Sequence, residues 1–271
     1  MTQYSPAPDS RIRARKRFGQ HFLHDQGVIS DIISAIDPQV GDRLIEIGPG
    51  LGALTLPLLT RCQTLEVVEL DRDVIPILEA RAAPLGKLTV HAADVLKVDF
   101  KSLSMDSRQL RLCGNLPYNI STPLLFHVLS AAAFIKDMHF MLQKEVVMRM
   151  AASPDTSDYG RLTVMLAVHC HVEHLFNVGP EAFRPPPKVN SSVVRLLPHA
   201  APPFQIDDTA RFAQVVAAAF GQRRKTLRNS LRGVVDNAGF EATLIDPSRR
   251  AETLSPADFA RLSNTKPPEL P

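Results

Sequence analysis

The stretch RLIEIGPGLG, residues 43–52, decides the fold, because an apolar run leads directly into three glycines. The run from Arg43 to Ile47 has the length and composition of a short buried strand. Glycines after such a strand let the backbone pass close to a ligand, since no Cβ stands in the way. We therefore expect a strand, a glycine turn and then a helix that begins near Leu51.

Short apolar runs alternate with helical patterns along the following hundred residues. Such alternation is typical of βαβ units, so the pattern predicts an α/β fold with a parallel sheet covered on both faces. Before it, residues 28–36 predict an amphipathic helix capped by Asp25. Residues 172–178 and 192–197 predict two strands that pair antiparallel at the edge of the sheet. The other expected strands are 65–70, 88–92, 110–113 and 138–142, with helices over 73–83, from 121 and from 144.

A proline-rich break, PHAAPP at residues 198–203, separates this pattern from a helical one. Helices are expected over residues 207–220 and 223–235, and a further one begins at Ser255-Pro256. A chain of 271 residues is long enough for two domains. We predict a basic N-terminal segment (1–24), an α/β domain (25–200) and a small all-α C-terminal domain (201–271).

Composition excludes several classes of protein. With 45% hydrophobic and 22% charged residues the chain can bury a core, which argues against disorder. No apolar stretch approaches the roughly 18 residues that span a bilayer, and no secretory signal is visible. Three cysteines without a CxxC pair favour a reducing compartment, so we expect a cytoplasmic protein with no membrane association.

Positive charge is concentrated in two segments that contain no acidic residue. Residues 11–17 hold five basic residues and residues 209–235 hold six, whereas the whole chain has a net charge of only +3. Segregated cations indicate a surface that binds nucleic-acid phosphates, although one such run alone is as often a solvated face. The expected RNA-binding residues are Arg15, Lys16, Arg17, Arg223, Arg224, Lys225 and Arg228.

Carboxylates follow the next two expected strands. Glu69 ends the strand after the glycine loop, where it can accept both hydroxyls of a ribose, and Asp94 follows the third strand, where it can meet an adenine amino group. Together with Gly48 and Gly50 they predict an adenosine-containing cofactor, either NAD or S-adenosylmethionine (SAM). The loop does not complete G-x-G-x-x-G, because residue 53 is alanine, which argues against NAD.

The run Asn115-Leu116-Pro117-Tyr118 follows the fourth strand, at the edge where a methyl donor would point. An aromatic amino nitrogen is a poor nucleophile, so a site must fix it with its lone pair toward the methyl group. The Asn115 oxygen and the Leu116 carbonyl can each accept one N–H, Pro117 can make the turn rigid and Tyr118 can stack on the base. Phe183, in a proline-rich loop, is a candidate for the second face of a base clamp.

Other interpretations of these residues remain. Asn115 could simply cap the following helix, and Phe183 could be a core residue. Cys113 could suggest a cytosine C5 methyltransferase, but Asn115 occupies the place of the nucleophile in the loop, so we expect Cys113 to be a buried strand residue. His169, Cys170, His171 and His174 are a dense cluster of metal-ligand types, yet methyl transfer requires no metal, and we expect none.

Several longer motifs make the sequence resemble the bacterial small-subunit ribosomal RNA adenine dimethyltransferases. They are RFGQHFL (17–23), EIGPGLGALT (46–55), ELDRD (69–73), NLPYNIST (115–122), MLQKEV (141–146), FRPPPKVNSSVVRL (183–196) and FGQRRKTLRNSL (220–231). The resemblance covers residues 11–262. It implies a Rossmann-like SAM-dependent methyltransferase fold with a small helical C-terminal domain.

The same resemblance implies SAM-dependent N6,N6-dimethylation of two adjacent adenines in the 3′-terminal hairpin of 16S rRNA, within an immature 30S subunit, by a monomeric enzyme. By motif position it also implies that His21 and Leu23 join Gly48, Glu69, Asp94 and Asn115 at the SAM site. Two rival functions stay open: an RNA-bound assembly or transcription factor on a methyltransferase scaffold, and a 23S rRNA adenine methyltransferase that confers antibiotic resistance.

Overall fold

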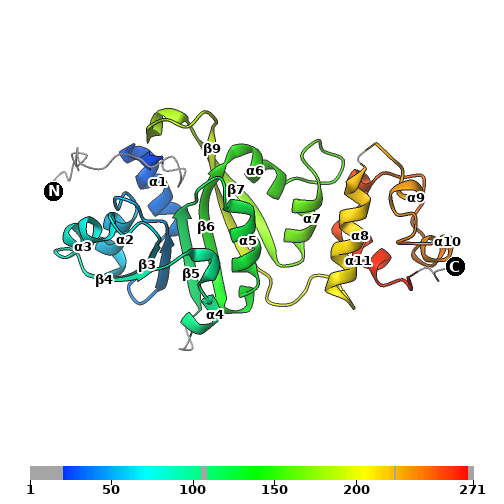
Figure 1. The fold of residues 1–271 in the computed structure, drawn as a ribbon, viewed down its shortest axis with the longest axis horizontal. Coiled ribbons are helices and arrows are strands. Elements are labelled where there is room, and N and C mark those ends of the chain that lie inside the picture. The colour runs from blue at the N-terminus through cyan, green and yellow to red at the C-terminus, as the bar shows by residue number, and fades with distance from the viewer. Residues whose placement is uncertain (1–20, 105–108, 223, 268–271) are drawn as a thin grey trace.

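A seven-stranded sheet forms the centre of the computed structural model, which describes residues 21–104, 109–222 and 224–267 (Figure 1). Its strands lie in the order β4-β3-β2-β5-β6-β9-β7. The first five are parallel, whereas β9 pairs antiparallel with both β6 and β7. Their bounds are β2 (Arg43–Ile47), β3 (Thr64–Glu69), β4 (Lys87–Ala92), β5 (Leu110–Asn115), β6 (Ile135–Gln143), β7 (Cys170–Val178) and β9 (Ser191–Pro198).

Helices connect the parallel strands, which confirms the predicted α/β class. The first of them is capped as expected, because the Asp25 carboxylate accepts a hydrogen bond from the Val28 amide at 3.0 Å. The helices of this part are α1 (Gln26–Ile36), α2 (Thr55–Cys62), α3 (Ile75–Ala82), α4 (Phe100–Leu103), α5 (Ser121–Leu129), α6 (Lys144–Met150) and α7 (Arg161–Ala167).

Two apolar clusters lie on the two faces of the sheet. Neighbouring residues of one strand point to opposite faces, so Leu112 joins the cluster under α5 whereas Cys113 joins the cluster under α1 and α2. Phe140 and Met141 of β6 divide in the same way. With both faces buried, the sheet leaves its edge at the carboxyl ends of the strands for a ligand.

A two-stranded ladder joins distant parts of the chain above that edge. β1 (Phe22–Leu23) pairs antiparallel with β8 (Phe183–Arg184), and the His24 amide donates to the Ala182 carbonyl at 2.9 Å. The ladder therefore brings the beginning of the described chain beside the proline-rich loop.

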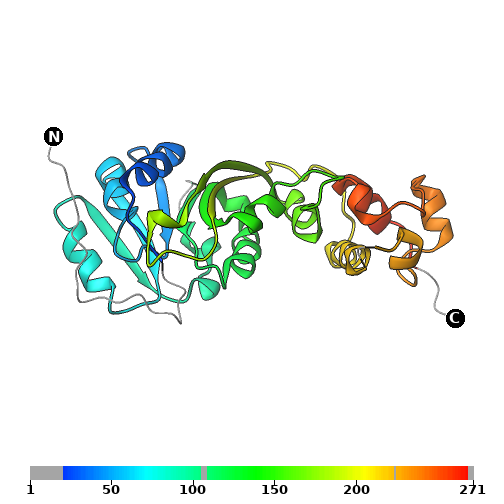
Figure 2. The same cartoon turned by 90° about the horizontal axis from the view of Figure 1, so that it is seen from above.

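The helices after β9 surround a third apolar cluster, which includes Phe212, Val216 and Phe259. Tyr159 and Val164 enter the same cluster from the region of α7. Seen from above, these helices form one end of an elongated molecule (Figure 2). They are α8 (Thr209–Gly221), α9 (Leu227–Ser230), α10 (Asn237–Thr243) and α11 (Pro256–Ser263). Within the described residues, none of the helices has the length and apolar character needed to cross a bilayer.

Two expected helices differ from the structure. The helix after the glycine loop begins at Thr55 rather than Leu51, because Gly52 has a φ of 88°, outside helical geometry. The helix expected over residues 223–235 is reduced to α9, because the amides of Leu227 and Arg228 donate to the carbonyls of Arg249 and Pro247 instead of a preceding helical turn. Gly233 then has a φ of 78°, which ends helical continuation. The sequence patterns also missed the helices α4, α7 and α10 and the short strands β1 and β8.

Candidate active site

A cavity of about 390 Å³ opens at the carboxyl edge of the sheet, above β2, β3 and β5. Its volume lies within the range of about 300–1,000 Å³ typical of small-molecule sites. All residues expected at the cofactor and all four residues of the Asn-Leu-Pro-Tyr turn line it: His21, Leu23, Gly48, Gly50, Glu69, Asp94, Asn115, Leu116, Pro117 and Tyr118.

The glycine loop after β2 has a backbone that other residues would strain. Gly48 and Gly50 have φ angles of 68° and 52°, in the left-handed region that favours glycine. Gly114 on the neighbouring strand is needed for packing, because a Cβ there would lie 2.3 Å from the Ile47 carbonyl oxygen. The two strand ends can therefore approach closely enough to form one wall of the cavity.

Glu69 links the end of β3 to this loop. Its carboxylate accepts the Asp71 amide at 2.8 Å and the Gly50 amide at 3.2 Å. Burial raises the pKa of Glu69, and these two backbone hydrogen bonds oppose that increase. Asp94 accepts the Leu96 amide at 3.1 Å with one oxygen. Each carboxylate oxygen has two lone pairs, so both side chains keep acceptor capacity toward the cavity.

Asn115 is the last residue of β5, and its side chain is oriented by the chain's N-terminal part. Its Nδ2 donates to the His21 carbonyl at 3.3 Å, which leaves Oδ1 as the remaining acceptor. The next residue is fixed as well, because the Leu116 amide donates to the Met141 carbonyl of β6 at 3.1 Å. The turn is thus held by β6 on one side and by the residue before β1 on the other.

Tyr118 ends this turn and lies between two partners. Its ring stacks on the His21 ring, with centroids 5.9 Å apart and an angle of 27° between the planes. Its hydroxyl lies 2.7 Å from the Ser191 Oγ, and burial raises the pKa of the phenol, which keeps it neutral. His21 Nδ1 donates to the Pro185 carbonyl at 2.8 Å, because a carbonyl can only accept. The ring of Tyr118 is therefore held in place before any ligand binds.

The prediction that Phe183 supplies a second aromatic face to the cavity is corrected by the structure. Phe183 pairs with Leu23 in the β1–β8 ladder, and its side chain is 2% exposed within the cluster under α1 and α2. The ring fills the core, so it has no free face to offer a base.

Sequence reasoning assigned no role to Glu46, although the structure places it in the cavity lining. Its carboxyl group is buried in β2 and accepts a hydrogen bond from the Thr55 hydroxyl at 2.6 Å. Burial raises its pKa to about 8, and the nearby Glu69 charge adds to that increase. A single carboxylate in the apolar strand RLIEI was the signal that could have identified it.

Replacing Glu46 by glutamine is expected to change how stability depends on pH. The pKa of Glu46 is higher in the folded than in the unfolded protein, so its contribution is fully present below about pH 4.3 and is lost as pH rises through about 8. Urea denaturation between about pH 5 and about pH 8 should therefore show a smaller decline in unfolding free energy for Glu46→Gln than for wild type. Glu79→Gln, on the exposed side of α3, serves as the control. Parallel curves for Glu46→Gln and wild type would contradict the assignment.

The structure also describes the candidate nucleophile Cys113 and the candidate metal ligands. Cys113 is fully buried in β5, as expected for a strand residue, and burial raises the pKa of its thiol well above its usual range. His171 and His174 lie on β7. Among the residues that the structure describes, no group of three or more His, Cys, Asp and Glu side chains is placed to hold a metal ion.

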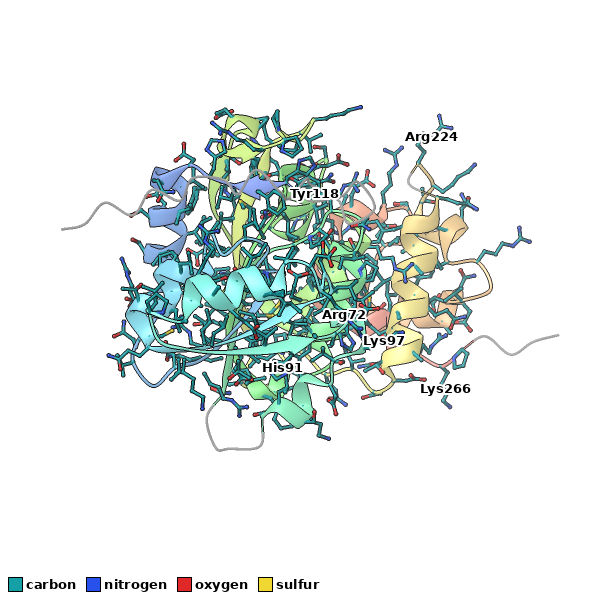
Figure 3. The ribbon with its side chains drawn as sticks, turned by 60° about the vertical axis from the view of Figure 1, so that its left-hand side comes forward. Arg72, His91, Lys97, Tyr118, Arg224 and Lys266 are labelled. Atoms are coloured by element: carbon teal, nitrogen blue, oxygen red, sulfur yellow. The ribbon has the colours of Figure 1, made fainter. Side chains whose placement is uncertain are left out.

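The expected RNA-binding residues are only partly described. Arg15, Lys16, Arg17 and Arg223 lie outside the described residues. Arg224 and Lys225 follow α8, and Arg228 is on α9. Arg224 extends away from the ribbon on the same upper side of the view as Tyr118 (Figure 3). The loop after α8 and the carboxyl edge of the sheet also share the upper side of Figure 1.

Solved structures with this arrangement include a dimethyladenosine transferase from Plasmodium falciparum. It superimposes with a TM-score of 0.76 at 26% identity and covers 89% of this chain and 96% of its own. The 23S rRNA methyltransferase ErmE has the same fold, with a TM-score of 0.70 at 24% identity over 89% of this chain and 98% of its own.

Sequence relatives are more similar still. The proteins named ribosomal RNA small subunit methyltransferase A from Pseudomonas putida and Xanthomonas oryzae pv. oryzae are both 56% identical to this chain, over 252 and 254 residues. The alignments cover 93% and 94% of this chain and 94% and 97% of those relatives. The model of the family described as ribosomal RNA adenine dimethylase matches residues 11–267. The chain therefore belongs to the ribosomal RNA adenine dimethylase family.

Proposed function

We propose that this protein transfers methyl groups from SAM to the N6 atoms of two adjacent adenines in the 3′-terminal hairpin of 16S rRNA, during assembly of the small ribosomal subunit. The family and the 56% identity to ribosomal RNA small subunit methyltransferases A support this proposal. The observation that carries it is the Asn115 side chain at the end of β5, whose Nδ2 is bound to the His21 carbonyl so that Oδ1 is left as an acceptor.

The cavity fits SAM by the chemistry of its lining. Glu69 would accept the ribose hydroxyls, Asp94 would accept the adenine amino group, and Gly48 and Gly50 would let the backbone approach the amino-acid part beside His21 and Leu23. SAM supplies an electrophilic methyl group on a cationic sulfur. We propose that no metal ion takes part, because hydrogen bonds alone can prepare the nucleophile.

The chain's own residues orient the target nitrogen. Asn115 Oδ1 and the Leu116 carbonyl each accept one N–H of the adenine amino group, which turns its lone pair toward the methyl donor. Pro117 limits movement of the turn, and Tyr118, held by Ser191 and His21, stacks on the base. As the nitrogen gains the methyl group it becomes acidic, so its proton can leave to water without a strong base.

We propose that the two basic segments, residues 11–17 and 209–235, bind the RNA. We propose that residues 201–271 form a small RNA-contacting domain beside the methyltransferase domain of residues 25–200, after a basic N-terminal segment of residues 1–24. Arg15, Lys16, Arg17 and Arg223–Lys225, with Arg228, would contact phosphates. The three cysteines are free and buried, which supports a reducing, cytoplasmic location. We propose that the enzyme is monomeric and acts without membrane contact.

Changing Arg223, Arg224 and Lys225 together to alanine should weaken binding to the ribosomal RNA. Each lost phosphate contact should also flatten the salt dependence of the binding constant by up to about 0.9 log units, because fewer counterions are released. Fluorescence anisotropy at several salt concentrations measures both effects, and SAM affinity should not change. Arg61, Lys87 and Lys136, exposed at the opposite edge of the sheet, provide a matched triple-alanine control. An unchanged salt slope would assign Arg223–Lys225 to an ordinary solvated surface.

The proposed function is tested by the site of methylation. The protein is incubated with tritiated SAM and unmethylated 30S particles, with naked rRNA and 50S particles as controls, and the methylated nucleotides are mapped. Label in two adjacent adenines of the 16S hairpin supports the proposal. Label in 50S particles would instead indicate a 23S rRNA methyltransferase, and tight binding without label would indicate an assembly factor.

A further inference from the structure

Two sequence motifs, residues 141–146 and 183–196, meet at a second cavity. The segment 141–146 contributes Gln143, Lys144 and Glu145, and the segment 183–196 contributes Val189 and Asn190. Met148 and Asp158 complete the wall of this open cavity of about 400 Å³. Residues more than forty positions apart therefore form one site.

Backbone pairing explains why the two motifs meet. Gln143 ends β6 directly opposite Ser191, which begins β9. One residue further on, the Lys144 amide donates to the Asn190 carbonyl at 2.9 Å. Main-chain hydrogen bonds therefore hold the floor of the second cavity in place.

The second cavity adjoins the catalytic turn. The Tyr118 hydroxyl lies 2.7 Å from the Oγ of Ser191, the residue that pairs with Gln143. Tyr118 lines the first cavity and Gln143 lines the second. The contact between Tyr118 and Ser191 therefore links the lining of the first cavity to the strand pair that borders the second.

The wall of the second cavity combines two kinds of surface. Met148 and Val189 are apolar, yet their side chains are 37% and 44% exposed. Lys144 adds a cation, and Asp158 adds an exposed carboxylate. The third charged group, Glu145, forms an ion pair with Arg149.

A nucleotide matches this combination better than a purely anionic or purely apolar ligand. Its base has a flat face for the exposed Met148 and Val189 side chains, and its phosphate suits Lys144. The Asp158 carboxylate would repel a phosphate, but it can accept the N–H groups on the edge of a base.

We propose that this second cavity binds the nucleotide adjacent in the RNA strand to the adenine held at Asn115. The proposal rests on the proposed function, since it assumes a polynucleotide whose target base enters the first cavity. A strand must continue from that base in both directions. In Figure 1, α6, α7 and α8 follow one another from the sheet toward the helical end of the molecule. Lys144 and Met148 of the second cavity are on α6, so a strand that leaves the target base toward Arg224 would pass this cavity.

The decisive experiment combines a protein variant with an altered RNA. The variant is Met148→Ala/Val189→Ala, and the substrates are 30S particles reconstituted with 16S rRNA that is intact or has one abasic residue on the 5′ or the 3′ side of the methylated adenines. With intact rRNA we expect the variant to raise KM about tenfold at nearly unchanged kcat, because the apolar contact between the base and these two side chains is lost. With the base removed on one of the two sides, variant and wild type should have the same KM for methylation of the adenine next to the abasic residue.

Controls separate this inference from the proposed function. Val40→Ala changes an apolar side chain that is 69% exposed between α1 and β2, at the opposite edge of the sheet, and should leave KM unchanged. SAM affinity reports that the double variant is folded. If wild type does not methylate intact particles, the proposed function fails. If wild type methylates them but the variant has the same KM, or if its defect persists on both abasic substrates, the nucleotide site is refuted. The variant could also show its KM defect on 30S particles but not on naked rRNA that wild type methylates. That result would assign the cavity to a ribosomal protein and would likewise overturn the nucleotide site.

Discussion

Replacing Asn115 by alanine should lower kcat by on the order of a hundredfold or more, with much smaller changes in KM for SAM and RNA. The reason is that Oδ1 meets an N–H whose nitrogen gains positive charge only as the methyl group arrives, so its contribution is made mainly in the transition state. Single-turnover methylation of unmethylated 30S particles measures the effect. SAM affinity, determined separately, confirms that the cavity is intact.

The substitution Asn115→Asp tests the acceptor oxygen of this side chain separately from its donor nitrogen. Aspartate keeps an acceptor and adds a negative charge beside the cationic sulfur, but it removes the donor that binds the His21 carbonyl. We expect it to retain more activity than alanine and less than asparagine. If both variants dimethylate at rates close to wild type, the Asn-Leu-Pro-Tyr turn only leads into α5 and has no catalytic role.

Replacing Glu69 by alanine should weaken SAM binding by roughly 1.5–3 kcal/mol, the range for a hydrogen-bond partner that carries a charge. This loss corresponds to a dissociation constant about ten to 150 times larger. The structure adds a second reason for a large effect, because the carboxylate also holds the Gly50 amide of the loop. Isothermal titration calorimetry measures the affinity, and RNA binding should be nearly intact.

A control on the same strand makes the Glu69 experiment specific. Glu66 of β3 is paired with Arg43 and His91 and has no place in the cavity lining. Glu66→Ala should therefore leave SAM affinity unchanged. Equal affinity of Glu69→Ala and wild type would show that the carboxylate has no part in binding the ribose.

The features that sequence alone predicted correctly are those set by local patterns. The run RLIEI predicted a short buried strand, and Asp25 with the isoleucines after it predicted the beginning of a helix; the structure has both. The carboxyl ends of parallel strands share one edge, so Glu69, Asp94 and Asn115 could be placed together without coordinates. That they bind SAM and adenine remains a prediction.

The features that sequence missed depend on contacts between distant residues. The helix expected over 223–235 is shortened because Leu227 and Arg228 bond to residues about twenty positions later. An aromatic residue in a proline-rich loop suits a core and a base clamp equally, and only pairing with Leu23 assigns Phe183 to the core. Likewise, no local pattern shows that the segments 141–146 and 183–196 meet.

The hydrogen bond from His21 to Pro185 spans 164 positions of the chain, and it has a consequence for how the protein is made. Synthesis proceeds from the N-terminus, and domains begin to fold as they emerge. Strands β2 to β6 can pair early, but β1 must wait until β8 has been translated. Until then Asn115 lacks the His21 carbonyl that orients it. The nascent chain therefore acquires its parallel strands well before it acquires a complete active site. A fragment that ends before Phe183 would have these five strands without β9 and without the oriented asparagine.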